Sequence, residues 1–261
     1  MTMPHPHPLL PQMRAEAPAL VGLAVPIVIG YAASMLLGVT DSLMLAPLGA
    51  VPLAAVGLTT AISGILFAAV WGLLGVLGVQ IGAAWGAGEA RRIPELLRNG
   101  LMLGLLAGLG GAALMGLAWF ALPFLRQPAE VLRAMPVYWA LMALMMIPFA
   151  VLTVFKSAFE AVDRPWLGTI FAFVAVAINI PLNYWLIWGG LGLPALGLVG
   201  AGIASVLAEA VALAAAWAFW ARARSMRRLR LRRALDWAAI VAAGREGMSL
   251  GMLYTFESGA M

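Results

Sequence analysis

Long apolar segments alternate with short charged segments along this chain. Ala17–Thr40 contains no charged residue, and after Asp41 none appears until Glu89. Asn99–Leu125 and Ala134–Phe155 are also free of charge. Because a helix needs about 20 apolar residues to cross roughly 30 Å of hydrocarbon, each of these segments is long enough to span a membrane. The pattern therefore predicts four spans in the first part of the chain.

Glycine and proline divide the two longest apolar stretches. The stretch after Asp41 exceeds one span, and its turn is marked near the start by Pro47, Gly49 and Pro52. Pro165–Ala208 is broken by three glycines and a proline, namely Gly189, Gly190, Gly192 and Pro194. It predicts a fifth span and most of a sixth, which continues past Glu209 to Ala221. A seventh helix is expected to begin near Trp237.

The predicted fold class is an all-α integral membrane protein, with a six-helix transmembrane lobe followed by the start of a seventh helix. We expect a disordered, proline-rich tail over residues 1–16, in which His5 and His7 bind no metal. The six-helix lobe is assigned to residues 17–221. A basic cytoplasmic linker is assigned to residues 222–236, and the seventh helix to residues 237–261.

The composition supports a membrane protein over a soluble one. Hydrophobic residues make up 64% of the 261 residues, charged residues 10%, and the mean hydropathy is +0.98. Soluble domains are roughly 45–50% apolar and about 25% charged. The chain has no cysteine, which excludes a disulfide framework and cysteine-ligated metal. The lipid bilayer is thus the expected partner.

Positive charge is distributed unevenly over the loops. The N-terminal tail and the loops between spans two and three, four and five, and six and seven carry fourteen Lys and Arg residues, whereas the remaining loops carry only Arg126 and Arg133. The positive-inside rule then places the N-terminus in the cytoplasm of a multi-pass inner-membrane (plasma-membrane) protein. The net charge of +5 is explained by this orientation, and no nucleic-acid partner is expected.

Asp41 is the first candidate functional residue, because an acid inside a membrane costs roughly 2.5–3.5 kcal/mol on insertion scales. It can take up a proton, bind a sodium ion or bind a cationic substrate. The alternative is an interfacial residue that ends the first span. Pro26, in the middle of that span, removes a helical hydrogen bond, and predicts either a functional bend or a static kink.

Asn179 and Asn183 lie four residues apart and therefore share a helix face, with Pro181 freeing a carbonyl between them. Such a patch suits a sodium ion, a proton network or a polar ligand, and it equally suits hydrogen bonding between helices. Glu257, in the seventh helix, and Glu209, in the sixth, are further candidates by the same insertion cost.

Two other patterns have structural interpretations. Lys156 and Glu160 lie four apart at the end of span four, with Asp163 and Arg164 following, and we expect an ion-pair cluster that holds the loop. Glycines on one face of span two predict close helix packing, and they are Gly72, Gly75, Gly78 and Gly82. No catalytic or nucleotide-binding motif appears, so the chain is not expected to be an enzyme and no cofactor or resident metal is expected.

Several segments together resemble the first half of transporters of the multidrug and toxic compound extrusion (MATE) family, in particular the NorM-like branch. The order and spacing of the segments carry the resemblance, which covers about Met13 to Met261. They are Leu23-Ala24-Val25-Pro26, Asp41, Leu48-Gly49, Leu53-Ala54-Ala55, Gly86-Ala87-Gly88-Glu89, Phe155 to Glu160 through Pro165, Asn179 to Asn183, Gly192 to Gly197 and Gly200-Ala201-Gly202.

The resemblance implies half of a twelve-span fold and export of small organic cations against a proton or sodium gradient. It implies that Asp41 is a coupling residue, that Pro26 bends its helix, and that Asn179 and Asn183 shape the cation site. The acid of span seven corresponds to Glu257. Members often have an acid where this chain has Asn183, so the choice between H⁺ and Na⁺ stays open.

Two alternatives remain. One is a related flippase for lipid-linked precursors, although apart from Lys156 the basic residues lie in loops. The other is a non-transporting truncated fragment, because only 15 residues run from Gly247 to Met261 and the C-terminal lobe is missing. The segment at Gly247 also resembles a loose repeat of the segment at Gly22, as expected where a second half begins.

Overall fold

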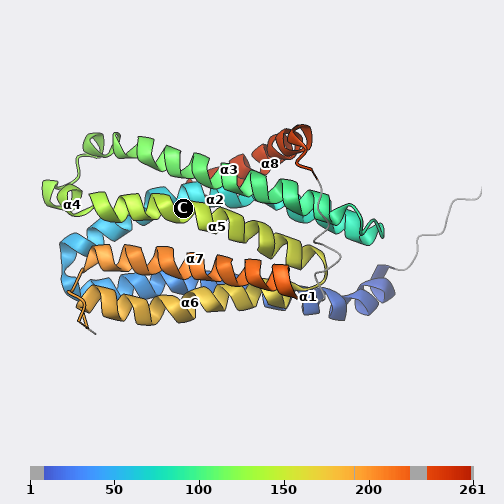
Figure 1. Ribbon diagram of the computed structural model, residues 1–261, viewed down its shortest axis with the longest axis horizontal. Helices are drawn as coiled ribbons and strands as arrows, with labels where there is room; N and C mark the ends of the chain where they lie inside the picture. The colour runs from blue at the N-terminus through green and yellow to red at the C-terminus, as the bar shows by residue number, and fades with distance from the viewer. Residues whose placement is uncertain (1–8, 191, 224–233, 260–261) are drawn as a thin grey trace, which may run out of the picture.

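The computed structural model describes residues 9–190, 192–223 and 234–259, and within them the chain is almost entirely helical. The long helices run side by side along the longest dimension of the molecule (Figure 1). The helices are α1 (Leu9–Leu45), α2 (Ala50–Gly86), α3 (Ile93–Trp119), α4 (Ala129–Ala134), α5 (Pro136–Ala161), α6 (Pro165–Trp188), α7 (Leu198–Arg222) and α8 (Trp237–Gly259), with single 3-10 turns at η1 (Ala46–Leu48) and η2 (Leu122–Leu125).

Six of these helices (α1, α2, α3, α5, α6 and α7) are long and apolar enough to cross a membrane. The prediction of an all-α, six-span lobe is confirmed. The turns expected from glycine also form, since Gly49 has a φ of 107° before α2 and Gly189 has a φ of 82° after α6. The seventh helix begins at Trp237, as predicted.

Several helix ends differ from the charge-free windows. α1 begins at Leu9, although residues 1–16 were expected to form a tail, because Leu, Gln, Met, Arg, Ala and Glu favour a helix and Pro11 falls in the first turn. α3 begins at Ile93 instead of Asn99, with Pro94 and Glu95 in its first turn. The short helix α4 was not predicted. Charge-free windows thus locate the hydrocarbon-spanning part of a helix and miss its charged first turn.

Glycines of α3 lie in closer contact with a neighbouring helix than most of the glycine stripe expected in α2. A methyl group built on Gly104 would lie 2.8 Å from Val154 of α5, and one on Gly108 would lie 2.8 Å from the Ile147 backbone. A methyl on Gly75 of α2 meets nothing within 4 Å. The expectation that Gly72, Gly75, Gly78 and Gly82 form one tight face is therefore wrong, and only Gly72 is in close contact.

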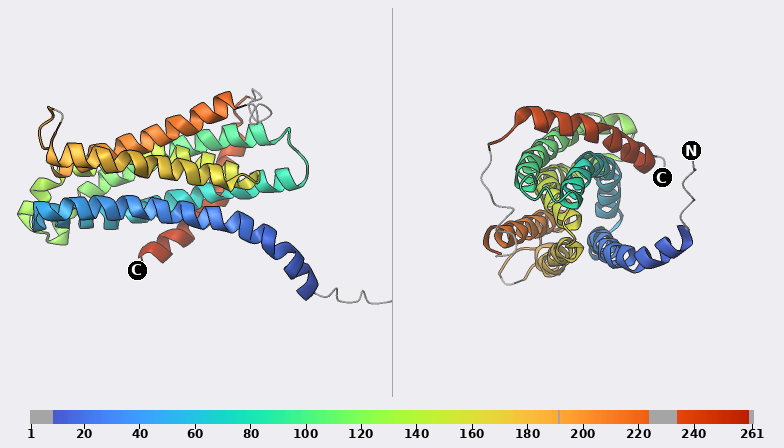
Figure 2. Two further views of the ribbon diagram at one scale, coloured as in Figure 1. Left: turned by 90° about the horizontal axis from the view of Figure 1, so that it is seen from below. Right: turned by 90° about the vertical axis from the view of Figure 1, so that its right-hand side faces the viewer.

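α1 packs mainly along α6. Its buried positions among the described side chains are spaced by three, four or eight residues, and they are Pro26, Gly30, Ala33, Asp41 and Leu45. The stripe follows the helical repeat and meets small or apolar positions of α6, among them Ala172 and Val176. The N-terminal part of α1 curves away from the rest of the bundle (Figure 2).

α8 crosses the bundle obliquely and packs against α2 (Figure 2). Gly247 and Gly251 form a small-xxx-small pair at this crossing. A methyl on Gly247 would overlap the carbonyl oxygen of Leu73, and one on Gly251 would lie 3.0 Å from that of Ala69. The two glycines therefore let the backbones of α2 and α8 approach directly.

Replacing Gly247 by alanine tests this crossing. Because the added methyl meets a backbone oxygen that cannot move aside, we expect Gly247→Ala to lower the free energy of unfolding by about 1–3 kcal/mol. Gly244→Ala is the matched control on the same helix, since its methyl meets Leu103 at an ordinary 3.5 Å. Thermal unfolding in detergent measures both, and equal stability of the two variants would contradict the proposed close crossing.

Candidate functional site

The side chain of Asp41 lies inside the bundle, 6% exposed, although it is an acid. Its Oδ1 accepts a hydrogen bond from Asn183 Nδ2 of α6 at 2.5 Å. Its Oδ2 accepts one from Ser205 Oγ of α7 at 2.7 Å. Among the described residues no Lys or Arg nitrogen lies within 4 Å of either oxygen. Within the described part of the chain, the carboxylate thus accepts hydrogen bonds from neutral donors and has no cationic side chain beside it.

Two further hydrogen bonds close a ring of four side chains, which we call the Asp41 ring (Asp41, Asn179, Asn183 and Ser205). Asn183 Nδ2 also donates to Asn179 Oδ1 at 2.9 Å, and Asn179 Nδ2 donates to Ser205 Oγ at 3.2 Å. Asn179 and Asn183 are fully buried. Asn183 Oδ1 is buried without a hydrogen-bond partner. The ring therefore joins α1, α6 and α7 and retains one unused acceptor.

Three of these four residues, Asp41, Asn179 and Asn183, were assigned to one site from the sequence. Asn179 and Asn183 lie on one face of α6, as their spacing predicted, and that face meets Asp41. Ser205 was missed. It is the only hydroxyl residue in the sequence of α7 and it precedes Glu209 by one helical turn, which is the signal that could have identified it.

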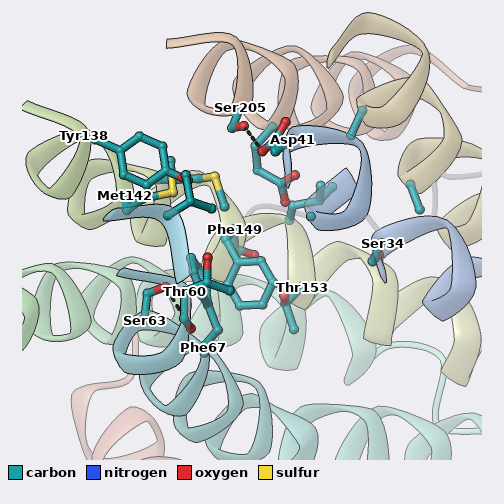
Figure 3. Close-up of a pocket in the computed structure, with 18 of the residues that line it drawn as sticks. Ser34, Asp41, Thr60, Ser63, Phe67, Tyr138, Met142, Phe149, Thr153 and Ser205 are labelled. Carbon is teal, nitrogen blue, oxygen red and sulfur yellow. Dashed lines mark hydrogen bonds between the residues drawn. The ribbon is translucent and has the colours of Figure 1, made fainter. Parts of the chain in front are cut away.

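A cavity of about 240 Å³ adjoins the ring and is lined by residues of α1, α2, α5, α6 and α7. Asp41 and Ser205 line it beside the apolar walls formed by Phe67, Phe149 and Met142, as Figure 3 shows. Glu209 and Lys156 line the same cavity. The candidate Glu209 is therefore connected to Asp41 through this space, with no direct contact between them.

The expected ion-pair cluster at the end of α5 does not form. Lys156 and Glu160 are not within 4 Å of each other, and Lys156 Nζ instead lies 5.9 Å from the ring centroid of Tyr31 in α1. Glu160 lies towards α6, where a methyl on Gly168 would be 3.5 Å from its Oε1. Asp163 accepts a hydrogen bond from Trp85 Nε1 at 2.7 Å, which joins the ends of α2 and α5. Lys156 thus lies over the Tyr31 ring without a close ion pair to Glu160.

Pro26 is buried in α1, and its carbonyl oxygen accepts a hydrogen bond from Thr169 Oγ1 of α6 at 2.5 Å. Thr169 also reaches the carbonyl of Pro165 at 3.3 Å. A threonine thus holds the proline segment of α1 to α6. Glu257 lies in α8, and its side chain falls outside the described part of the chain. His5 and His7 also lie outside it.

The order of the spans, the buried acid of the first span and its asparagine partners agree with the resemblance drawn from the sequence. The sequence profile of the MatE family matches residues 26–185. The chain belongs to the MatE family. Within the matched region lie Pro26, Asp41, Asn179 and Asn183, and Ser205 lies beyond it.

Curated relatives are similar over most of this chain. "Probable multidrug resistance protein NorM" of Neisseria meningitidis serogroup A is 29% identical over 211 residues, covering 77% of this chain and 45% of the relative. "Multidrug resistance protein MdtK" of Cronobacter sakazakii is 31% identical over 194 residues, covering 71% and 42%. The chain thus spans about half the length of the curated relatives it matches.

Solved MATE structures share the fold. The eukaryotic transporter AtDTX14 superposes with a TM-score of 0.87 at 18% identity, over 95% of this chain and 55% of that one. The Vibrio cholerae transporter VcmN in its bent form gives a TM-score of 0.80 at 23% identity, over 94% and 55%. The chain therefore has the fold of about half of a MATE transporter.

Replacing Ser205 by alanine tests the Asp41 ring. The variant leaves Oδ2 of a buried carboxylate without a donor, so we expect a loss of about 1–3 kcal/mol in the free energy of unfolding at neutral pH. Ser42→Ala is the control, because Ser42 Oγ donates only to the Gly38 carbonyl of its own helix. Thermal unfolding in detergent compares the two, and an unchanged stability of Ser205→Ala would show that the carboxylate does not depend on this donor.

Proposed function

We propose that this chain is part of a secondary active antiporter that exports cationic organic compounds in exchange for H⁺ or Na⁺, with Asp41 as the coupling residue. The observation that supports the proposal is a buried carboxylate that lines a cavity and, among the residues that the structure describes, forms no ion pair. An ionisable group at that depth favours binding of a cation from outside the protein. Membership of the MatE family and the names of its relatives support the same activity.

The Asp41 ring offers oxygen atoms to a coupling ion. The two carboxylate oxygens, the unused Asn183 Oδ1 and the oxygens of Asn179 and Ser205 suit a hard cation such as Na⁺. A proton would instead bind one oxygen of Asp41 and displace the hydrogen bond donated there. Either ion neutralises the carboxylate, so a cationic substrate in the cavity and the coupling ion compete for one charge.

Cationic substrates fit the cavity better than anionic lipid precursors. Its lining residues include the acids Asp41 and Glu209 and a single basic side chain, Lys156. Its walls of phenylalanine and methionine favour flat or flexible apolar groups. A flippase for anionic lipid-linked precursors would need more positive charge at this surface.

The remaining parts of the proposal concern the surroundings of the lobe. The positive-inside rule favours a cytoplasmic N-terminus in the inner membrane. The spans place the lobe in the lipid bilayer. The apolar surface left open on α1 includes Met35, Val39 and Leu43. A second, C-terminal lobe is the partner that would complete the cavity.

Asp41→Asn should abolish transport. We would measure ethidium efflux from drug-sensitive cells that express the chain joined to the second half of a MATE transporter, beside the chain alone. We expect efflux only from the joined protein. In Asp41→Asn we expect that efflux to fall to the level of empty vector, because the amide carries no charge with which to bind the coupling ion. Glu130→Gln, an exposed acid in α4, is the control.

Retained efflux in Asp41→Asn would contradict the coupling role, and efflux from neither form would contradict drug export. Efflux from the short chain would show that six spans suffice. Imposing a Na⁺ gradient or a pH gradient separately on vesicles decides the coupling ion.

Pro26→Ala should slow turnover without weakening ethidium binding, since alanine restores the helical hydrogen bond and stiffens α1. Thr169→Val removes the hydrogen bond to the Pro26 carbonyl and tests the same segment from α6. Initial rates of efflux and ethidium affinity are measured together. A static kink predicts unchanged rates in both variants.

A further inference from the structure

Three aromatic rings meet where α1, α2 and α8 come together, apart from the Asp41 ring. The centroids of Tyr31 and Trp71 are 5.3 Å apart with the planes at 89°, and those of Trp71 and Tyr254 are 4.8 Å apart at 66°. We call these residues the aromatic cluster. Tyr31 precedes Asp41 by ten residues, which is about 15 Å along a helix. The coupling scheme at Asp41 makes no use of them.

A cation already lies on this cluster. Lys156 Nζ is 5.9 Å from the centroid of the Tyr31 ring, within the range in which an ammonium is attracted to an aromatic face. Lys156 also lines the cavity that contains Asp41. Its side chain therefore lies at the junction between the aromatic cluster and the cavity.

A carboxylate lies one helical turn from this lysine. Glu160 follows Lys156 on α5, and its Oε1 lies beside Gly168 of α6. Aromatic faces are a means by which proteins recognise quaternary ammonium and related organic cations, and a nearby acid adds electrostatic attraction. The ammonium of Lys156 is the stand-in for such a ligand in this arrangement.

The cluster is held in place by the packing of α8 on α2. A methyl on Gly72 would lie 2.6 Å from Cδ2 of Tyr254 and 2.8 Å from the carbonyl oxygen of Leu250, so the Tyr254 ring is pressed against the α2 backbone beside Trp71. Tyr31 nevertheless remains 37% exposed. Rings fixed from one side and open on the other form a preorganised surface for a ligand.

We propose that Tyr31, Trp71, Tyr254 and Glu160 form a second binding site for organic cations, and that Lys156 occupies this site as a tethered cation until the ligand displaces it. The ligand class rests on the proposed function. The displaced ammonium can turn to the cavity, where Glu209 provides a carboxylate. The organic cation would then occupy the aromatic cluster before it reaches the cavity and Asp41.

Equilibrium binding of ethidium to the purified chain in lipid nanodiscs, followed by fluorescence, tests the site. Asp41→Asn should leave one class of binding site, which Trp71→Leu then weakens about 10-fold and Trp71→Phe largely preserves. Lys156→Met should tighten binding at the cluster, since the competing ammonium is removed. Trp166→Leu, an exposed tryptophan of α6, is the matched control and should bind as the parent does.

Lys156 is the only lysine in the sequence, so incorporation of lysine labelled with ¹³C at Cε gives a single side-chain resonance. Its chemical shift should carry the ring-current effect of Tyr31 and lose it in Tyr31→Leu. Adding ethidium to the parent chain should move the resonance towards its position in Tyr31→Leu. This readout does not depend on transport and confirms in one experiment whether the ligand displaces the lysine.

The outcomes separate this inference from the proposed function. Loss of all ethidium binding in Asp41→Asn, with Trp71→Leu unchanged and the lysine resonance unmoved by ethidium, would overturn the aromatic site and leave the Asp41 site standing. Binding that is sensitive to Trp71 and Lys156, with transport unaffected by Asp41→Asn, would support the aromatic site while contradicting the coupling role. Absence of any ethidium binding to the parent chain would overturn both.

Discussion

A carboxyl group in the interior of a membrane bundle needs hydrogen-bond partners, and at Asp41 those partners link three helices. Its two oxygens are met by donors from α6 and α7, while Asp41 itself comes from α1. Removing a charge from water without compensation costs far more than a folded domain can tolerate. Asp41 therefore links α1, α6 and α7 at this level, beside the cavity that it lines.

The contacts around Asp41 are polar, whereas other helix contacts in the lobe depend on close packing at glycine positions. Glycines of α3 admit the side chains of α5, and glycines of α8 admit the backbone of α2. In lipid, where the hydrophobic effect does not drive helices together, such close approach supplies the dispersion contacts that a soluble core would obtain by burial. The same packing fixes Tyr254 beside Trp71, so a structural device also positions the aromatic cluster.

The fold could be predicted well from the sequence because helix spans and turns depend on residues that are close together along the chain. Charge-free length identifies spans, and the turns at Gly49 and Gly189 follow from residues that tolerate positive φ. The pairing of Asn179 with Asn183 follows from the helical repeat. Contacts between helices could not be deduced in this way. Ser205 became part of the site only through the way α7 faces α1. Lys156 lies over the Tyr31 ring, 125 positions away, and forms no close ion pair with Glu160 one turn along. Such choices depend on the three-dimensional neighbours of each side chain.

α1 is attached to the bundle differently from the other spans. Among the six spans it has the smallest buried share, and its contact is concentrated on α6 through Pro26, Gly30, Ala33 and their neighbours. It makes little contact with α2, although the two helices follow each other in the chain. The free energy needed to detach a helix grows with the apolar area that it loses. The helix that carries the one acid of the ring is thus the least buried span within this chain. Its side-chain hydrogen bonds to α6 and α7 include those of Asp41 and the one that Thr169 donates to the Pro26 carbonyl, so neutralising Asp41 weakens the attachment of a lightly held helix.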